Sequence, residues 1–166
     1  MYLREHSIYD CIINNALNYS DEIALVSGDL RLTYGEVPLH VNSLARGLLN
    51  TGFEKGDRIG VLLNNCSEYA LLLAACTRIG LITVCLNPRT SADEMRKMLE
   101  QAKPKALIFQ KSYEQQADEL RELGIHRQLY CIDEASILSS SFDQLLDEAP
   151  SPLTEPQPAV DDGWLI

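Results

Sequence analysis

The stretch Gly56–Arg89, GDRIGVLLNNCSEYALLLAACTRIGLITVCLNPR, decides the fold of this chain. Two short apolar runs within it, Ile59–Leu63 and Leu81–Leu86, have the length of strands and are bounded by turn residues. Between them lies a segment of helix length, Cys66–Ile79, which Gly80 follows as a C-terminal glycine does. The pattern predicts two parallel strands joined by a crossover helix.

The expected crossover helix, Cys66–Ile79, is apolar on nearly every side. Asn65 stands three residues before Glu68, the spacing of a capping box, so we expect the helix to begin there. A helix without a polar face must be covered on more than one side. The sequence therefore predicts that this helix is packed between other elements.

The segments on either side continue the alternation of helices and strands. We expect a helix after Ser7 with an apolar stripe through Ile8, Ile12, Ala16 and Tyr19, and then a hairpin that turns at Gly28-Asp29. Thr33 and Glu36 have the spacing of a capping box for the next helix. Because Pro38 lacks an N–H, that helix either begins late, near Pro38, or has a distorted first turn. Capping boxes at Ser91–Glu94 and Ser112–Gln115 predict two more helices. We expect strands at Lys105–Phe109 and Gln128–Ile132, and a short last helix at Phe142–Glu148. The fold class is therefore α/β: a mostly parallel sheet with helices on both faces, plus an N-terminal β-hairpin.

Composition limits the kinds of partner. The chain has 166 residues and a net charge of −10, which argues against nucleic acid and anionic membranes. No apolar run is long enough to span a bilayer, and the N-terminus has no signal core, so we expect a cytoplasmic protein. The five cysteines form no CxxC pair, and we expect buried thiols and no metal site.

The sequence offers few residues for chemistry. It contains no GxGxxG, GxxxxGK[ST] or GxSxG motif, and its three histidines are scattered. We interpret Asp161-Asp162 as a solvated acidic turn. Asn87-Pro88-Arg89 is the candidate ligand-binding loop, because it follows a strand at the carboxyl edge, where parallel sheets bind ligands. The alternative is an ordinary loop turn.

Two motifs in order resemble the N-terminal part of the acyl-adenylate-forming enzymes. Leu32–Val37, LTYGEV, is similar to the first core motif of that family, L-T-Y-x-E-L. Arg78–Arg89, RIGLITVCLNPR, is similar to the second, R-x-G-A-x-x-V-P-L-N-P-R, with Leu81 and Cys85 in place of alanine and proline. The LNPR ending looks more like an acyl- or aryl-CoA synthetase than a peptide-synthetase domain, in which an aspartate commonly follows the proline. The resemblance covers nearly all of the chain.

The resemblance implies that the parent protein is an ATP-dependent acyl-CoA synthetase, an acid–thiol ligase. Such an enzyme uses ATP, Mg²⁺ and coenzyme A to convert a carboxylate first to the acyl-AMP and then to the acyl-CoA. The phosphate loop, the adenine and ribose sites and the C-terminal lysine of the family have no counterpart in these 166 residues. We therefore carry over no catalytic residue and expect the chain alone to bind none of these cofactors. The resemblance implies that this segment serves as a scaffold, and that Asn87, Pro88 and Arg89 form part of the wall of the coenzyme A or acyl channel.

Two other functions remain open. A complete flavodoxin-like binding module, without chemistry, fits the periodicity equally well but does not account for the two ordered motifs. An adenylation domain of a peptide synthetase fits the motifs, but Arg89 stands where such a domain commonly has aspartate.

The last residues differ in composition from the rest. We divide the chain into an α/β subdomain, residues 1–149, and a proline-rich acidic connector, residues 150–166. The ending Asp161–Ile166, DDGWLI, is similar to the lead-in to the family's phosphate loop, so we expect a cut chain whose partner is the rest of the same polypeptide. We also expect the fragment to self-associate, because its apolar helix Cys66–Ile79 would lack cover.

The natural reading frame is predicted to continue past Ile166 into a Ser/Thr/Gly-rich loop that contains a lysine. The reason is the strand-like, acidic lead-in at Asp161–Ile166. Sequencing the source transcript beyond the codon for Ile166 tests this prediction. A stop codon directly after Ile166 would contradict the prediction and favour the binding module.

Overall fold

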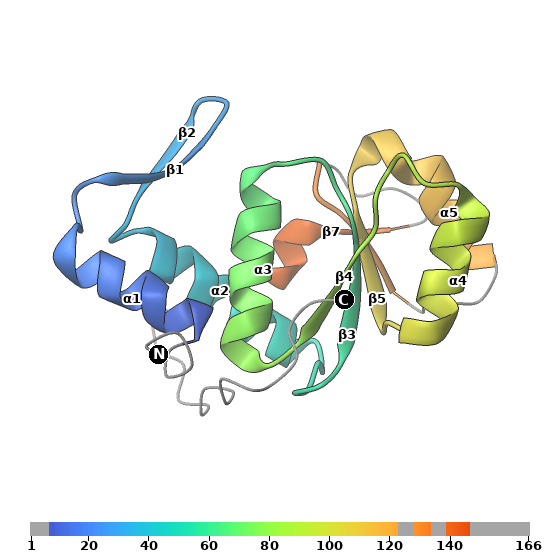
Figure 1. The fold of residues 1–166 in the computed structure, drawn as a ribbon, viewed down its shortest axis with the longest axis horizontal. Coiled ribbons are helices and arrows are strands. Elements are labelled where there is room, and N and C mark those ends of the chain that lie inside the picture. The colour runs from blue at the N-terminus through green and yellow to red at the C-terminus, as the bar shows by residue number, and fades with distance from the viewer. Residues whose placement is uncertain (1–6, 123–127, 134–138, 147–166) are drawn as a thin grey trace, which may run out of the picture.

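A computed structural model gives the fold and describes residues 7–122, 128–133 and 139–146. Its main sheet has the strand order β4-β3-β5-β6-β7, and every neighbouring pair is parallel, which confirms the expected sheet (Figure 1). The strands are β3 (Arg58–Leu62), β4 (Ile82–Cys85), β5 (Ala106–Phe109), β6 (Gln128–Cys131) and β7 (Ser140–Ser141). The predicted strands at 59–63, 81–86, 105–109 and 128–132 are thus confirmed to within one or two residues.

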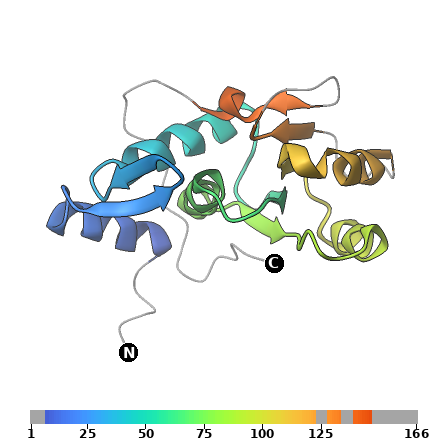
Figure 2. The same ribbon diagram turned by 90° about the horizontal axis from the view of Figure 1, so that it is seen from above.

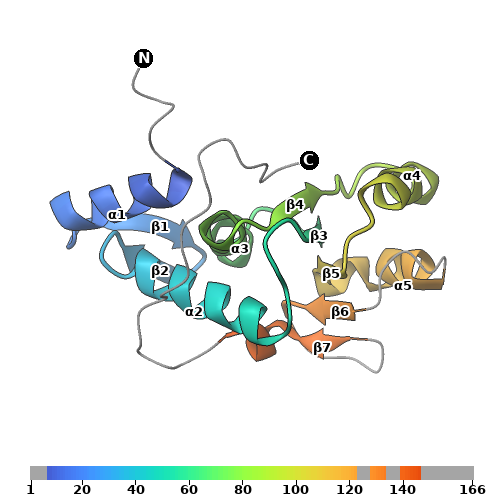
Figure 3. The same ribbon diagram turned by 90° about the horizontal axis from the view of Figure 1, so that it is seen from below.

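Helices cover both faces of this sheet, as predicted. One face packs against α2 (Val37–Asn50) and α3 (Ser67–Ile79), on which α1 (Ile8–Asn18) packs in turn, and the other packs against α4 (Ala92–Ala102) and α5 (Glu114–Glu122). Figure 3 shows the strands in succession between these two groups of helices. The alternation of side chains along β5 explains the two cores, because Ile108 faces α3 and its neighbours Leu107 and Phe109 face α4 and α5.

The expected N-terminal hairpin is confirmed and forms a separate two-stranded sheet. β1 (Ile23–Ser27) pairs antiparallel with β2 (Leu30–Thr33), and Gly28 at the turn has a φ of +57°. The hairpin lies beside α1 and α2 and projects beyond the helical layer (Figures 1 and 2). Several of its apolar side chains are exposed, among them Ile23 and Val26.

Helix α3 is covered on both sides, as its composition requires. Leu72, Ala75 and Cys76 are fully buried in the core that α1 and α2 complete over the sheet. The guanidinium of Arg78 lies 5.0 Å from the centre of the Tyr9 ring of α1, a cation–π contact. Most of the cover for α3 therefore comes from within the chain, while Ala70 is exposed and Leu71 and Leu73 are half-buried, and self-association stays a prediction.

Several helix ends differ from the sequence expectation. The predicted Asn65–Glu68 capping box does not form, because the N-cap of α3 is Cys66 and Ser67 Oγ donates to the Glu68 carboxylate instead. Thr33 and Glu36 do exchange the two expected bonds, yet they close a turn before α2. That helix begins at Val37, with Pro38 in its first turn, which confirms the late start.

Three further corrections concern shorter segments. α5 begins at Glu114 rather than at Ser112, because a 3₁₀ turn, η1 (Lys111–Tyr113), precedes it. The last expected helix is a single 3₁₀ turn, η2 (Phe142–Leu145). On α1, Tyr9 is buried while Ile8 and Tyr19 are exposed, so the apolar stripe expected through Ile8, Ile12, Ala16 and Tyr19 is rotated. The capping boxes at Ser7 and Ser91 are confirmed.

The cysteines follow the expectation in part. Cys76 and Cys131 are buried and Cys66 and Cys85 half-buried, whereas Cys11 is exposed, which corrects the prediction of buried thiols. Among the described residues, no helix combines the length and the hydropathy needed to cross a bilayer. The connector at 150–166, with its acidic turn at Asp161-Asp162, lies outside the described residues.

The 3₁₀ turn η2, near the end of the described residues, packs closely against a glycine of α2. Gly47 of α2 faces η2, and a Cβ at this position would overlap the carbonyl group of Leu145. Leu145 is fully buried, and Phe142 of the same turn belongs to the core above α2. A larger residue at position 47 would therefore push η2 off the helix.

Replacing Gly47 by alanine is predicted to lower the free energy of unfolding by about 1–3 kcal/mol, the usual cost of an overpacked core. The intrinsic preference of a helix for alanine offsets only about 1 kcal/mol of the steric cost. Urea unfolding measures the change, with Leu39→Ala, at an exposed position of α2, as the control. A Gly47→Ala protein as stable as the wild type would show that η2 does not pack on this helix.

Candidate functional site

The carboxyl edge of the main sheet holds the candidate site. In the order β4-β3-β5, the chain leaves β3 for α3 on one face and leaves β5 for α5 on the other. The loops after β3 and β5 therefore diverge between two adjacent strands. Such a switch point is where open parallel sheets bind ligands.

Three polar side chains join the two loops at the switch point. The backbone N–H of Asn64 and its Nδ2 both donate to Oε1 of Gln110, over 3.3 and 3.1 Å. The Tyr113 hydroxyl donates to Oδ1 of Asn64 over 2.6 Å. Asn64 follows β3, whereas Gln110 and Tyr113 follow β5, so these bonds join the two loops.

A third loop, the one after β6, adds to this edge. Oδ2 of Asp133 accepts a hydrogen bond from the backbone N–H of Lys111 over 2.7 Å, and the Lys111 ammonium pairs with Glu114 at 3.0 Å. The carboxylate of Asp133 thus holds the start of η1 in place. Its role here is to orient the β5 loop that carries Gln110 and Tyr113.

The sequence-predicted loop Asn87-Pro88-Arg89 lies at the same edge but not at the switch point. It follows β4, the outermost strand of the sheet, one strand away from the divergent pair. Asn87 Oδ1 accepts from the Arg89 N–H over 3.0 Å, and the Asn87 carbonyl accepts from the N–H and the hydroxyl of Thr90. Asn87 therefore has a structural role in the turn, and a role of the loop in ligand binding stays a prediction.

Arg89 presents the free cation of this loop. Its side chain is exposed, and among the described residues it has no hydrogen-bond or ion-pair partner beyond those of its backbone. An exposed guanidinium at the carboxyl edge can bind a phosphate or carboxylate bidentately. Of the three predicted site residues, Arg89 is the one with a chemical group to offer a ligand.

Behind this loop, a tyrosine and two cysteines lie between β4 and α3. Burial raises the pKa of Tyr69, and its hydrogen bond with Cys85 raises it further. Burial also raises the pKa of the Cys66 thiol at the start of α3. Tyr69 and Cys66 therefore stay protonated at neutral pH, and neither supplies an anionic nucleophile to the edge.

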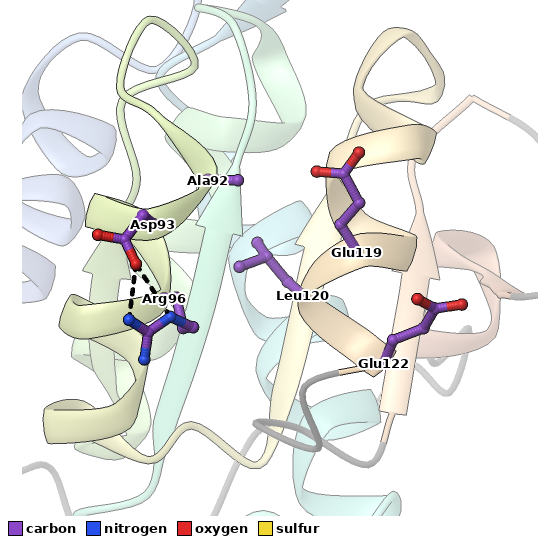
Figure 4. A pocket seen from close by; sticks show the side chains of 6 residues that line it. All are labelled: Ala92, Asp93, Arg96, Glu119, Leu120 and Glu122. Atoms are coloured by element: carbon purple, nitrogen blue, oxygen red, sulfur yellow. Dashed lines mark hydrogen bonds and ion pairs between the residues drawn. The ribbon is translucent and has the colours of Figure 1, made fainter.

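A separate groove of about 480 Å³ lies between α4 and α5 (Figure 4). Asp93, Glu119 and Glu122 give it an acidic rim, and its one cation, Arg96, is held by Asp93 and Glu100 at 2.6 Å each. Hydrogen bonds from Lys97 and Arg96 lower the pKa of Asp93 to about 2, so it stays charged. Such a rim disfavours an anionic ligand, which leaves the carboxyl edge as the candidate site.

Within the described part of the chain, no group of three or more His, Cys, Asp or Glu side chains is placed to hold a metal ion. The described residues therefore offer no resident metal centre. The histidines at positions 6 and 126 lie outside the described residues.

Sequence reasoning missed Asn64, Gln110 and Tyr113. Each follows a strand that the sequence did predict, so the available signal was a polar residue directly after an apolar run. What could not be read from the sequence is that β3 and β5 are neighbours, because β4 stands between them in the chain. Strand order, rather than spacing, identifies these residues.

Comparisons with known proteins agree with the fold. A family model described as "AMP-binding enzyme" matches residues 13–164. A mitochondrial medium-chain acyl-CoA ligase of Pongo abelii is 33% identical over 117 residues, which are 69% of this chain and 19% of that protein. An acyl-CoA ligase of Ajellomyces capsulatus is also 33% identical, over 68% of this chain and 20% of its own length. The chain thus spans about a fifth of the curated relatives it matches.

A solved structure extends the similarity to nearly all of the chain. A crystal structure from Rhodopseudomonas palustris, described as a long-chain-fatty-acid CoA ligase, superposes with a TM-score of 0.89 and 28% identity. The match covers 98% of this chain and 41% of the other.

Proposed function

Because this chain belongs to the family of AMP-binding enzymes, we propose that it forms the N-terminal α/β part of an ATP-dependent acyl-CoA ligase. The observation that carries the proposal is the superposition of 98% of this chain on 41% of a protein described as a CoA ligase. The names of the curated relatives, which are acyl-CoA ligases, support the same reaction. That reaction joins a carboxylate to ATP as acyl-AMP, with release of pyrophosphate, and then transfers the acyl group to the thiol of coenzyme A.

In this proposal the chain contributes binding surface rather than chemistry. Mg²⁺ supplies charge to the phosphates in such reactions. The described residues gather no metal ligands, so we assign no step through Mg²⁺ to them. The carboxyl edge instead provides hydrogen-bonded polar side chains at Asn64, Gln110 and Tyr113, and an exposed cation at Arg89.

Arg89 is proposed to contact a phosphate group of coenzyme A. The reason is its place after β4 at the carboxyl edge, where its guanidinium is exposed while the Asn87 turn fixes its backbone. A guanidinium recognises a phosphate through two parallel, charge-assisted hydrogen bonds. Pro88 and Asn87 would then serve to hold the turn that presents Arg89.

Two of the expectations from the sequence stay predictions. Self-association has a further basis besides the one first given, namely the exposed apolar side chains of the hairpin, such as Ile23 and Val26. The cytoplasmic location is not tested by any feature of the fold.

The proposed function predicts a clear difference between this chain and its full reading frame. The 166-residue chain alone is expected to catalyse no carboxylate-dependent exchange between ATP and pyrophosphate, because its sequence has no phosphate loop to stabilise the transition state. The full frame is expected to catalyse this exchange and to form acyl-CoA. Isotope exchange with a panel of fatty and aromatic acids measures both. Exchange by the chain alone, or adenylation by the full frame with no transfer to coenzyme A, contradicts the proposal.

Replacing Arg89 by alanine in the full-length protein is predicted to slow thioester formation by about tenfold, the loss expected for one charged hydrogen-bonded contact. The adenylation half-reaction is expected to be unchanged, because coenzyme A takes no part in it. Separate assays of the two half-reactions measure the split.

Arg31→Ala is the matched control, since it removes an exposed guanidinium from the distant hairpin. An equal loss in both half-reactions of the Arg89 variant, or a loss in neither, rejects the coenzyme A contact.

A further inference from the structure

The bonds between Asn64, Gln110 and Tyr113 join parts of the chain that are far apart in sequence. They connect residues 46 and 49 positions apart, and they join side chains of two loops that lead to helices on opposite faces of the sheet. Elsewhere at this edge, the bonds of Asn87 stay within its own turn. The Asp133 carboxylate joins the β6 loop to the β5 loop through a backbone N–H, whereas at the switch point side chains also bond to side chains.

We infer that Asn64, Gln110 and Tyr113 form a latch that sets the spacing of the two loops and so positions a ligand bound at the switch point. Tyr113 is the positioning residue, because it acts through Asn64: its hydroxyl occupies Oδ1 and leaves Nδ2 directed at Gln110. The inference rests on the proposed function where it names the ligand, coenzyme A. The latch itself rests on the bonds alone.

The geometry explains why the latch matters for position rather than for stability. All three bonds are accessible to solvent, so each contributes little to the free energy of unfolding. The backbone end of the β3 loop has its own tie, since the Gln110 N–H donates to the Leu62 carbonyl over 3.2 Å. Without the Tyr113 hydroxyl, the Asn64 side chain loses the bond that orients it, and its two bonds to Gln110, including the one from its backbone N–H, open more often. The expected result is a looser link between the two loops in a protein that is folded as before.

Hydrogen exchange on the 166-residue chain tests the latch without any ligand. Tyr113→Phe is expected to speed amide exchange at Asn64 by about fivefold, the effect of losing about 1 kcal/mol. Tyr19→Phe, which removes a hydroxyl from an exposed ring near the hairpin, is the matched control and is expected to change nothing at Asn64. Unchanged exchange at Asn64 in the Tyr113 variant overturns the latch.

A second pair of variants separates the latch from a general loss of packing. Gln110→Glu keeps an acceptor oxygen for both Asn64 donors and is expected to exchange as the wild type does. Gln110→Ala removes that oxygen and is expected to behave like Tyr113→Phe. Equal effects of Glu and Ala at position 110 contradict the latch, because only Ala lacks the acceptor.

The positioning role is measured in the full reading frame. Tyr113→Phe is expected to raise the KM for coenzyme A by about fivefold and to leave the KM for ATP and the adenylation rate unchanged. A faster exchange at Asn64 with an unchanged KM for coenzyme A overturns the positioning role alone. A full frame without ligase activity overturns the proposed function and the ligand assignment with it, while the exchange result still decides whether the latch exists.

Discussion

Helix α3 has no polar face, and covering it determines where the other elements lie. Leu72 and Cys76 are fully buried between the sheet and the α1–α2 layer. The contact that closes this layer is specific: the Tyr9 ring lies against the Arg78 guanidinium, and its hydroxyl donates to Asn42 of α2 over 2.8 Å. One tyrosine therefore connects α1, α2 and α3. With that face of the sheet occupied by α2 and α3, α4 and α5 cover the other face.

The two motifs that resemble the family have mainly structural roles here. In LTYGEV, Leu32 is buried, and Thr33 and Glu36 exchange the two bonds that turn the chain from β2 into α2. In RIGLITVCLNPR, Arg78 closes the helical layer, Gly80 ends α3 with a φ of +74°, and Asn87 builds the turn after β4. A glycine suits position 80 because a left-handed backbone strains other residues. The motifs thus mark packing requirements of the fold as well as membership of the family.

Local sequence signals predicted the elements well and their connections less well. Apolar runs located the four longer strands of the main sheet, and the Ser7 and Ser91 caps were correct because a capping box depends on residues three apart. The Asn65 and Ser112 caps were wrong because distant contacts decide those helix ends, as the bond from Lys111 to Asp133 shows. Distant contacts also explain why the sequence predicted the edge of the sheet that holds the site but not the residues that meet there. The edge follows from strand direction, whereas Asn64 and Tyr113 meet only because β3 and β5 are neighbours.

The place of β3 in the sheet has a consequence for how the chain folds as it leaves the ribosome. β3 is made before both of its neighbours, and β4, only a crossover helix away, is the first strand that can pair with it. β5, β6 and β7 can pair only later, each beside a strand already synthesised. The pairing of β3 with β5 closes the longest loop of the sheet, because α3, β4 and α4 lie between the two strands in the chain. Parallel pairing of this non-local kind is slow, so this step is expected to limit the folding rate.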